Sequence, residues 1–272
     1  MEKNSALNLT EDEQEILKPF EEAFDSYRNR RLCDRVSVVS SDGTQLAGAF
    51  YDEGSDITVI SLHAFNGSKD SDFLFAPYYG DKGYNVLMPD ARAHGDSEGR
   101  YVGYGHFEKE DLLAWIKWVN GTKGSESQII IHGIAAGAST ALLAASEGLP
   151  DNVMLLVLDS PYNSLADIVS YQIGKLYGLP RFPFMSILDY KLEKEAGYKM
   201  ADVDVVAAVR DSEIKIPALF IIGDGNDYIP PNSLIRYMKH IRQRKNWLPF
   251  PGRDMGCRTR LLRRNARKGF QD

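Results

Sequence analysis

The pattern of apolar residues changes along the chain from alternating to continuous. Residues 35–39 and 45–51 alternate between polar and apolar positions around the turn-forming sequence SSDGT, which predicts a β-hairpin. Five later segments are short, continuous apolar runs rich in β-branched residues. They are residues 57–63, 84–90, 128–133, 153–160 and 218–224. Because a strand without alternation is buried on both faces, these runs predict a parallel sheet covered by helices.

Helical periodicity appears between and after these runs. The clearest examples are residues 108–119, 138–147 and 233–240. Before the first strand, residues 11–31 form an amphipathic pattern in which Thr10 and Glu13 are spaced as a capping box. Strands that alternate with helices are typical of the α/β class. We therefore expect a doubly wound, mostly parallel sheet with helices on both faces.

One long segment interrupts the alternation of strands and helices. Residues 161–209 are rich in aromatic side chains and contain the helix-breaking sequence GLPRFP. An insertion that follows a strand at the carboxyl edge of a parallel sheet lies where a lid over a pocket would lie. The alternative is that this segment adds helices to the core. We expect an N-terminal helix within residues 1–31, a core at 32–252 that contains this insertion, and a separate tail at 253–272.

Composition narrows the class of protein. The 272 residues are 43% apolar and 26% charged, which is ordinary for a globular protein large enough to bury a core without disulfides. The net charge of −6 argues against a nucleic-acid partner. The first residues contain no apolar signal segment, and no run of about 18 apolar residues occurs anywhere. We expect no membrane span, reduced thiols at Cys33 and Cys257, and a cytoplasmic location.

A strand, a tight turn and a helix meet at the sequence GIAAG. Gly133 and Gly137 flank the turn, and glycine lets such a turn close without a Cβ clash. In a nucleophile elbow, G-x-S-x-G, this turn presents a reactive serine above the sheet. Here the central residue is Ala135, whose methyl group cannot attack a carbonyl, and Ser139 lies one helical turn further on. The motif alone is also compatible with a simple tight connection between a strand and a helix.

Four motifs in order resemble those of the α/β-hydrolase superfamily. They are LHAFNG, PDARAHGDSEG, GIAAG and GDGNDYIP. Together with the stretches SEGRYVGYG and DSPYNSLADIVSYQ, they are similar to a bacterial serine-hydrolase group that includes S33-like aminopeptidases. The resemblance covers about residues 30–252. It implies an α/β-hydrolase fold and hydrolysis of an ester, thioester or peptide-like acyl bond of a small-molecule substrate by a serine nucleophile, with no cofactor.

The resemblance also implies an oxyanion hole. The backbone amides of Phe65 and Ala136 would be its two donors, and each such donor is typically worth about 3 kcal/mol to the transition state. Two glycines of the family motifs are replaced here by Ala64 and Ala93. If either position requires a positive φ, alanine there costs roughly 1 kcal/mol or more.

The remaining two members of a serine-hydrolase triad are missing from their expected places. The resemblance places the acid at Asn226, where an amide cannot stabilise an imidazolium, and such a change costs about 10⁴ in turnover in a serine protease. Asp227, one residue further on, is a candidate substitute. The histidine should follow Gly252, yet all five histidines lie earlier. They are His63, His94, His106, His132 and His240. Of these, His106 and His240 are expected on the surface or in a helix.

The end of the chain differs in charge from the rest. Residues 251–272 hold seven basic and two acidic side chains, a net charge of +5, so the first 250 residues carry −11. One hypothesis is a one-nucleotide frameshift: the codons for Asp254-Met255-Gly256, GAY-ATG-GGN, become xGA-YAT-GGG, and YAT encodes only histidine or tyrosine. One consistent reconstruction replaces PGRDMG at residues 251–256 by PGAGHG, which restores a histidine before a glycine. With few apolar residues, segment 253–272 is expected to be disordered or loosely laid on the acidic body.

These substitutions favour an α/β-hydrolase that is catalytically inactive as written. One alternative is a pseudoenzyme that binds an acyl ligand in a retained pocket. Others are the product of a decaying gene, and an active hydrolase of which this chain is an engineered or frameshifted variant. No G-x-G-x-x-G follows the first strand, and no two histidines are spaced as metal ligands on one helix. We therefore expect neither a dinucleotide nor a metal.

Overall fold

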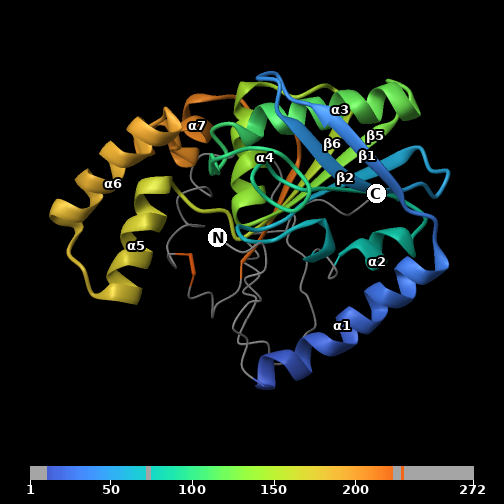
Figure 1. Cartoon of the computed structure of the whole chain (residues 1–272). Helices are drawn as coiled ribbons and strands as arrows, with labels where there is room; N and C mark the ends of the chain where they lie inside the picture. The colour runs from blue at the N-terminus through green and yellow to red at the C-terminus, as the bar shows by residue number, and fades with distance from the viewer. Residues whose placement is uncertain (1–10, 72–74, 223–227, 230–272) are drawn as a thin grey trace, which may run out of the picture.

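The computed structural model of the chain describes residues 11–71, 75–222 and 228–229. Its centre is a seven-stranded sheet in the order β1-β2-β4-β3-β5-β6-β7 (Figure 1). The first hairpin pairs antiparallel, β2 pairs antiparallel with β4, and the pairs from β4 to β7 are parallel. The strands are β1 (Asp34–Val39), β2 (Gln45–Tyr51), β3 (Ile57–Leu62), β4 (Asn85–Pro89), β5 (Gln128–Ile134), β6 (Val153–Asp159) and β7 (Ala218–Ile221).

Each strand expected from the apolar pattern is present, and the mostly parallel sheet is confirmed. The helices are α1 (Glu11–Arg30), α2 (Ala76–Gly80), α3 (Glu108–Lys123), α4 (Ala136–Glu147), α5 (Leu165–Tyr177), α6 (Arg181–Ala196) and α7 (Val205–Asp211). Two short 3₁₀ helices span Lys69–Ser71 and Met200–Asp202. The helix expected at 233–240, the capping residue Thr10 and the tail at 253–272 lie outside the described residues.

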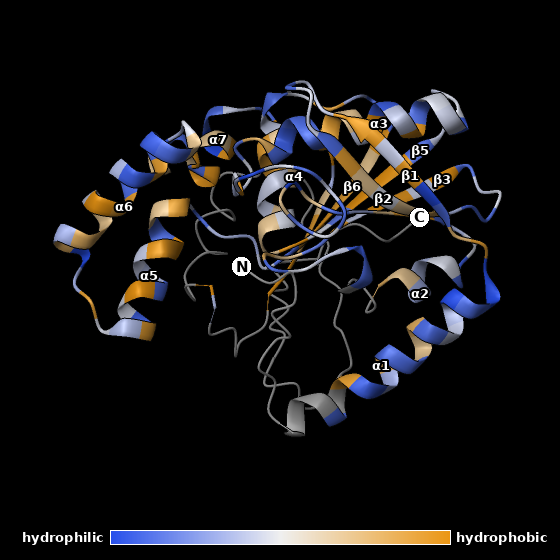
Figure 2. Ribbon diagram, in the orientation of Figure 1, coloured by the Kyte–Doolittle hydropathy of each residue, from blue (hydrophilic) through white to orange (hydrophobic). Residues whose placement is uncertain are grey.

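Helices cover both faces of the sheet, as the continuous apolar strands predict. Successive residues of a strand point to opposite faces. On β5, Ile131 therefore packs with α3, α4 and α7, whereas Ile130 packs with α1 and α2. The two resulting clusters are anchored by large buried rings, Trp115 on α3 and Tyr27 on α1. Figure 2 shows the apolar sheet between helices whose outward faces are polar.

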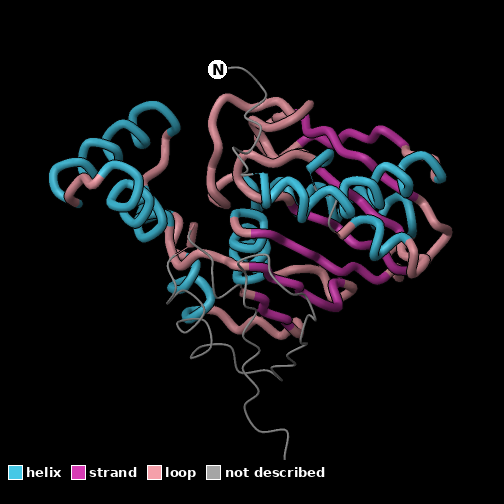
Figure 3. Tube along the Cα trace, turned by 90° about the horizontal axis from the view of Figure 1, so that it is seen from below, coloured by secondary structure: helices cyan, strands magenta, loops and turns pink. Residues whose placement is uncertain are grey.

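The insertion between β6 and β7 has two parts with different packing. Its second part joins the core, since Val205 and Val209 of α7 are buried in the same cluster as α4. Its first part is the pair α5 and α6, and none of the residues of α6 is buried. This pair projects from the sheet and the other helices (Figures 1 and 3). The lid function stays a prediction. No helix among the described residues has the length and apolar character needed to cross a membrane.

Helix α4 approaches the sheet unusually closely. A Cβ added to Gly137 would lie 2.3 Å from the Leu62 backbone oxygen at the end of β3. A Cβ added to Gly133 would lie 2.4 Å from the Ala138 nitrogen. Because both obstacles are backbone atoms, neither can move aside cheaply. These two glycines therefore set the distance between α4 and the sheet.

We expect Gly137→Ala to lower the free energy of unfolding by about 2–3 kcal/mol, the cost of an overpacked core position. Gly121→Ala is the matched control. Gly121 lies within α3, and a Cβ there meets nothing within 4 Å. The same substitution should therefore raise stability by roughly 0.5–1 kcal/mol through helix propensity. Urea denaturation measures both, and equal effects of the two substitutions would contradict the close approach.

Candidate active site

The turn between β5 and α4 holds Ala135 in a conformation that is rare for any residue except glycine. Its φ is 49° and its ψ is −102°. The Ala135 amide donates to the Asp159 backbone oxygen at the end of β6, at 2.8 Å. A non-glycine residue at positive φ costs on the order of 1–3 kcal/mol and persists only where its surroundings fix it. The sequence prediction of a sharp strand-to-helix turn is confirmed at this position.

Ser139 cannot take the place of a nucleophile at this turn. Its side chain is fully buried in the first turn of α4. The hydroxyl donates to the Ala135 backbone oxygen at 3.1 Å and accepts from the Tyr162 amide at 3.1 Å. It therefore joins α4 to the segment after β6.

A small cavity lies beside this turn. Its volume is about 50 Å³, and its wall is largely apolar. Residues from β3, α3, α4 and the connecting loops line it, among them Phe65, Tyr104, Leu112, Trp115, Ala136 and Thr140. Phe65 and Ala136, the two residues expected to supply oxyanion amides, thus lie at the same cavity although they are 71 positions apart in the sequence.

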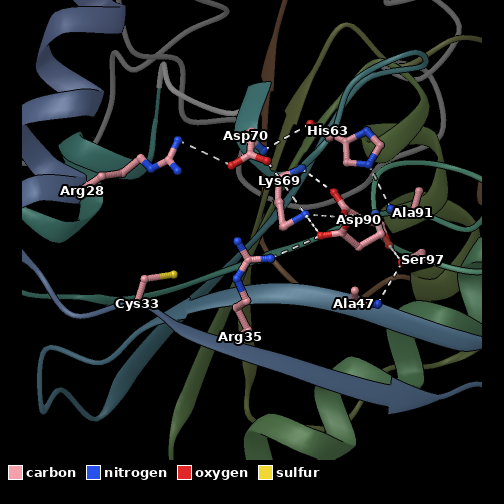
Figure 4. Close-up of polar contacts among 12 residues, drawn as sticks. Arg28, Cys33, Arg35, Ala47, His63, Lys69, Asp70, Asp90, Ala91 and Ser97 are labelled. Carbon is pink, nitrogen blue, oxygen red and sulfur yellow. Dashed lines mark hydrogen bonds and ion pairs between the residues drawn. The ribbon is translucent and has the colours of Figure 1, made fainter. Parts of the chain in front are cut away.

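His63 has a structural role at the end of β3. Its Nε2 accepts a hydrogen bond from the Ala91 amide at 2.9 Å, so this nitrogen carries no proton (Figure 4). Its Nδ1 therefore carries the proton and donates it to the Ala64 backbone oxygen at 2.8 Å. Burial lowers the pKa of His63 to about 4. The imidazole is thus neutral and joins two loops.

His94 is held in the same way. Its Nδ1 donates to the Arg92 backbone oxygen at 2.9 Å, and its Nε2 accepts from the Asn66 amide at 3.3 Å. The rings of His63 and His94 lie 5.1 Å apart, and the Phe65 ring packs edge-on against His94. Both nitrogens of both rings are therefore occupied by backbone groups.

The other described histidines lie away from the turn. His132 on β5 is buried on the face covered by α2, where its Nδ1 bonds to the Tyr79 hydroxyl at 3.0 Å. Burial lowers its pKa to about 4. His106 was expected on the surface or in a helix, but it precedes α3 and stacks on the Tyr198 ring at 4.8 Å. That packing half-buries His106, which corrects the expectation. His240 lies outside the described residues.

A buried charge cluster fixes the loop after β4, and the sequence analysis missed it. The Lys69 ammonium donates to Asp90 at 2.7 Å and to Asp96 at 2.8 Å (Figure 4). The Asp90 carboxylate also accepts the backbone amides of Lys69 and Asp96. A Cβ on Gly95 would lie 2.2 Å from this carboxylate, so the loop requires glycine there. The spacing of Lys69 and Asp90 in the sequence gives no local signal of this contact.

A second ion pair ties the same loop to α3. Arg92 donates through two nitrogens to Asp111, at 2.8 and 2.6 Å, and through a third to Asp42 at 2.8 Å. Burial opposes the charge on Arg92, but these hydrogen bonds outweigh it and raise its pKa. The guanidinium also lies over the Phe107 ring. A bidentate pair of this kind fixes orientation as well as position.

One aromatic residue that lines the cavity, Tyr104, has a strained backbone conformation. Tyr104 has a φ of 51°, and its ring stacks on Phe65 with centroids 5.2 Å apart. The Tyr162 hydroxyl donates to the Tyr104 backbone oxygen. The buried Glu108 carboxylate accepts the amides of Gly103 and Gly105 on either side, at 2.6 and 2.7 Å. Burial raises the pKa of Glu108. Sequence reasoning gave no role to these residues.

The expected acid position, Asn226 or Asp227, and the segment after Gly252 lie outside the described residues. The partly buried Asp159 lies within the described part, at the carboxyl end of β6. It accepts a hydrogen bond from the Ser160 hydroxyl at 2.8 Å, and burial raises its pKa. Across the residues that the structure describes, no three or more His, Cys, Asp or Glu side chains gather as metal ligands.

The two alanines at positions where the sequence motifs predict glycine differ in conformation. Ala93 has a φ of 61°, whereas Ala64 is not in the left-handed region. We expect Ala93→Gly to raise the free energy of unfolding by about 0.5–1 kcal/mol, because relief of the left-handed strain exceeds the added entropy of the unfolded chain. Ala64→Gly should lower it by a similar amount. Chemical denaturation of both variants tests this, and stabilisation by Ala64→Gly would refute the assignment of strain.

The buried neutral histidines predict sensitivity to acid. The folded pKa of His63 is about 4, below its ordinary value of 6.5, so the unfolded chain binds a proton that the folded chain excludes. This contribution to stability is complete above pH 6.5 and is lost as the pH falls towards 4. We expect His63→Gln to reduce the fall in unfolding free energy between pH 7.5 and pH 4.5 by about 2–3 kcal/mol.

The measurement is urea denaturation of parent and variant across that pH range. His132→Gln provides a second case on the opposite face of the sheet, where burial also lowers the histidine pKa to about 4. A His63→Gln variant with the parent's full pH dependence would show that the His63 ring is protonated in the folded protein.

The sequence profile of the family described as "alpha/beta hydrolase fold" matches residues 57–184. The uncharacterized protein YqkD of Bacillus subtilis is 31% identical over 185 residues, which is 68% of this chain and 60% of YqkD. The chain thus spans less than two thirds of that relative. A thermostable monoacylglycerol lipase of a Bacillus species is 26% identical over 207 residues, covering 69% of this chain and 78% of the lipase.

Solved structures share the arrangement of the sheet and helices. An esterase of Pyrococcus furiosus superposes with a TM-score of 0.64 and is 25% identical, covering 87% of this chain and 82% of the esterase. The acetyl xylan esterase 1 of a Thermoanaerobacterium species gives a TM-score of 0.59 at 17% identity, covering 87% of this chain and 86% of that one. At that identity the likeness concerns the fold alone.

Proposed function

We propose that this protein, which has the α/β-hydrolase fold, carries the site of a serine ester hydrolase that has lost its nucleophile and now binds a small acyl ligand without hydrolysing it. The relatives whose names state an activity are a monoacylglycerol lipase and esterases. They support an ester as the ancestral substrate. The S33-like aminopeptidase assignment stays a prediction.

The main support for the proposal is the identity of the residue at the sharp turn. Ala135 occupies the strained position between β5 and α4 at which G-x-S-x-G presents its serine. The strain is retained although alanine gains nothing chemically from it. A methyl group has no lone pair, so no acyl-enzyme can form there, and Ser139 is committed to two hydrogen bonds within the core.

The contacts of three described histidines support the same interpretation. A serine hydroxyl needs an adjacent base to become a nucleophile at neutral pH. Within the described residues, His63 and His94 use both ring nitrogens on backbone groups, and His132 lies on the other face of the sheet. After His240 the sequence contains no histidine. In place of the expected acid, the sequence has Asn226, with Asp227 as a candidate substitute.

The binding groups of an acyl site survive these losses, because they belong to the backbone. We assign the amides of Phe65 and Ala136 as donors to a carbonyl or carboxylate oxygen, in keeping with their place at one cavity. The cavity has an apolar wall and a volume of about 50 Å³, which suits the apolar part of an acyl group.

We expect the protein as written to turn over no p-nitrophenyl acetate above background and to resist labelling by a fluorophosphonate probe. Ala135→Ser alone should not restore turnover, because its hydroxyl has no base. Ala135→Ser combined with Asn226→Asp and the reconstructed ending PGAGHG should exceed the single variant by at least about 10⁴ in kcat. Ester hydrolysis and probe labelling by each variant are the readouts.

A Ser139→Ala variant is the control for probe labelling, since Ser139 is the nearest hydroxyl along the chain. If the probe labels the unmodified protein and Ser139→Ala abolishes that labelling, the proposed loss of the nucleophile is wrong. Full turnover by Ala135→Ser alone would instead reveal a working base, and would favour the alternative that this chain is an engineered variant of an active hydrolase.

A further inference from the structure

Tyr104, in the wall of the cavity, has a backbone conformation that suits glycine better than any other residue. Its φ of 51° lies in the left-handed region, and its neighbours in the sequence are Gly103 and Gly105. A bulky side chain at such a position is strained and persists only where the surrounding structure imposes it. Strain of this kind is typical of residues that clamp a ligand. The Tyr104 ring therefore calls for a role that offsets its strain.

Hydrogen bonds hold the backbone on both sides of Tyr104. The Glu108 carboxylate accepts the Gly103 amide at 2.6 Å and the Gly105 amide at 2.7 Å. The Tyr162 hydroxyl donates to the Tyr104 backbone oxygen. Glu108 is buried, so breaking its bonds would leave polar groups unsatisfied away from water. The backbone of Tyr104 is therefore fixed from three directions.

Close packing fixes the direction of the ring as well. A Cβ added to Gly105 would lie 2.6 Å from the Leu143 side chain, so this loop lies directly against α4. On the side of the cavity, the Tyr104 ring stacks on Phe65 with centroids 5.2 Å apart. Tyr104, Phe65 and Ala136 all line the cavity. The strained ring thus stands beside the two residues whose amides are the assigned donors.

We propose that Tyr104 determines which acyl chains enter the cavity, and that Glu108 is the positioning residue that holds the Tyr104 ring in place. The inference rests on the proposed function, because the amides of Phe65 and Ala136 would hold the carbonyl oxygen of the ligand. The ring then limits the space for the carbon chain beside that oxygen. A longer chain has to displace the ring against the hydrogen bonds that fix its backbone.

A purely structural role for the Tyr104 ring predicts a different outcome. If the ring only filled space between the loop and α4, its loss would weaken the fold and lower the affinity for every ligand by the same factor. A ring that selects ligands changes the ratio of two affinities instead. That ratio does not change when part of the protein is unfolded, because the unfolded fraction lowers both affinities equally.

The test is isothermal titration calorimetry of the full chain with butanamide and with octanamide. Both compounds are neutral and carry a carbonyl oxygen for the two backbone amides. We expect Tyr104→Ala to raise the ratio of octanamide affinity to butanamide affinity at least about tenfold. Each methylene that becomes buried strengthens binding about fourfold, so two methylenes admitted into the space of the ring supply this factor.

Glu108→Gln tests the positioning role. Its side-chain NH₂ group replaces one of the two oxygens that accept backbone amides, so one hydrogen bond to the loop is lost and the ring is held less firmly. The affinity ratio should rise at least about threefold in the parent and stay unchanged in the Tyr104→Ala background. Because both ligands are neutral, loss of the Glu108 charge by itself leaves the ratio unchanged.

Two further variants complete the experiment. Tyr104→Gly removes the same ring and relieves the backbone strain, so it gives a folded protein if Tyr104→Ala does not, and it should raise the ratio by a similar factor. Tyr190→Ala is the matched control, since Tyr190 is 65% exposed on α6, outside the wall of the cavity. It should leave the ratio at the parent value. Circular dichroism checks the folding of each variant.

The outcomes separate this inference from the proposed function. Binding of both amides with one ratio in the parent and the Tyr104 variants would overturn the inference and leave the acyl site supported. Binding of neither amide by any variant would overturn both. Octanamide binding that appears only when the Tyr104 ring is removed would support both. An equal effect of Glu108→Gln with and without the ring would overturn the positioning role.

Discussion

The close approach of α4 to the ends of β3 and β5 is the constraint on which the candidate site depends. Gly133 and Gly137 bring backbone against backbone, where a Cβ would meet a backbone atom at 2.4 or 2.3 Å. That approach forces the chain through the sharp turn at Ala135. It also brings the start of α4 to the loop after β3, so that Ala136 and Phe65 line one cavity. Packing of backbone against backbone therefore maintains this turn, whichever side chain occupies position 135.

Two buried charge clusters hold the loops that surround this turn. Asp90 gathers the Lys69 ammonium and two backbone amides, while Arg92 joins α3 through Asp111. A buried ion pair is weak evidence for stability, because desolvation offsets the attraction. Its effect here is positional: the loop after β4 is fixed against β3 and α3. His63 and His94 complete this frame, because both ring nitrogens of each side chain bond to backbone groups.

The proposed function separates two properties that are joined in an active hydrolase. Recognition of a carbonyl oxygen would rely on backbone amides, which survive the substitution of side chains. Bond cleavage would rely on side chains at three positions, and the sequence has Ala135 and Asn226 at two of them and no histidine after Gly252.

The sequence by itself determined the order of strands and helices, because continuous apolar runs are a local signal of strands buried on both faces. It also located the sharp turn at Ala135, since glycine spacing and residue identity are local too. It missed the bond from Lys69 to Asp90 and could not choose which alanine is strained. Only the tertiary structure decided that Ala93 is left-handed and Ala64 is not, and that the ring nitrogens of His63 and His94 bond to backbone groups. These features arise where segments distant in the sequence meet, and no local pattern records such a meeting.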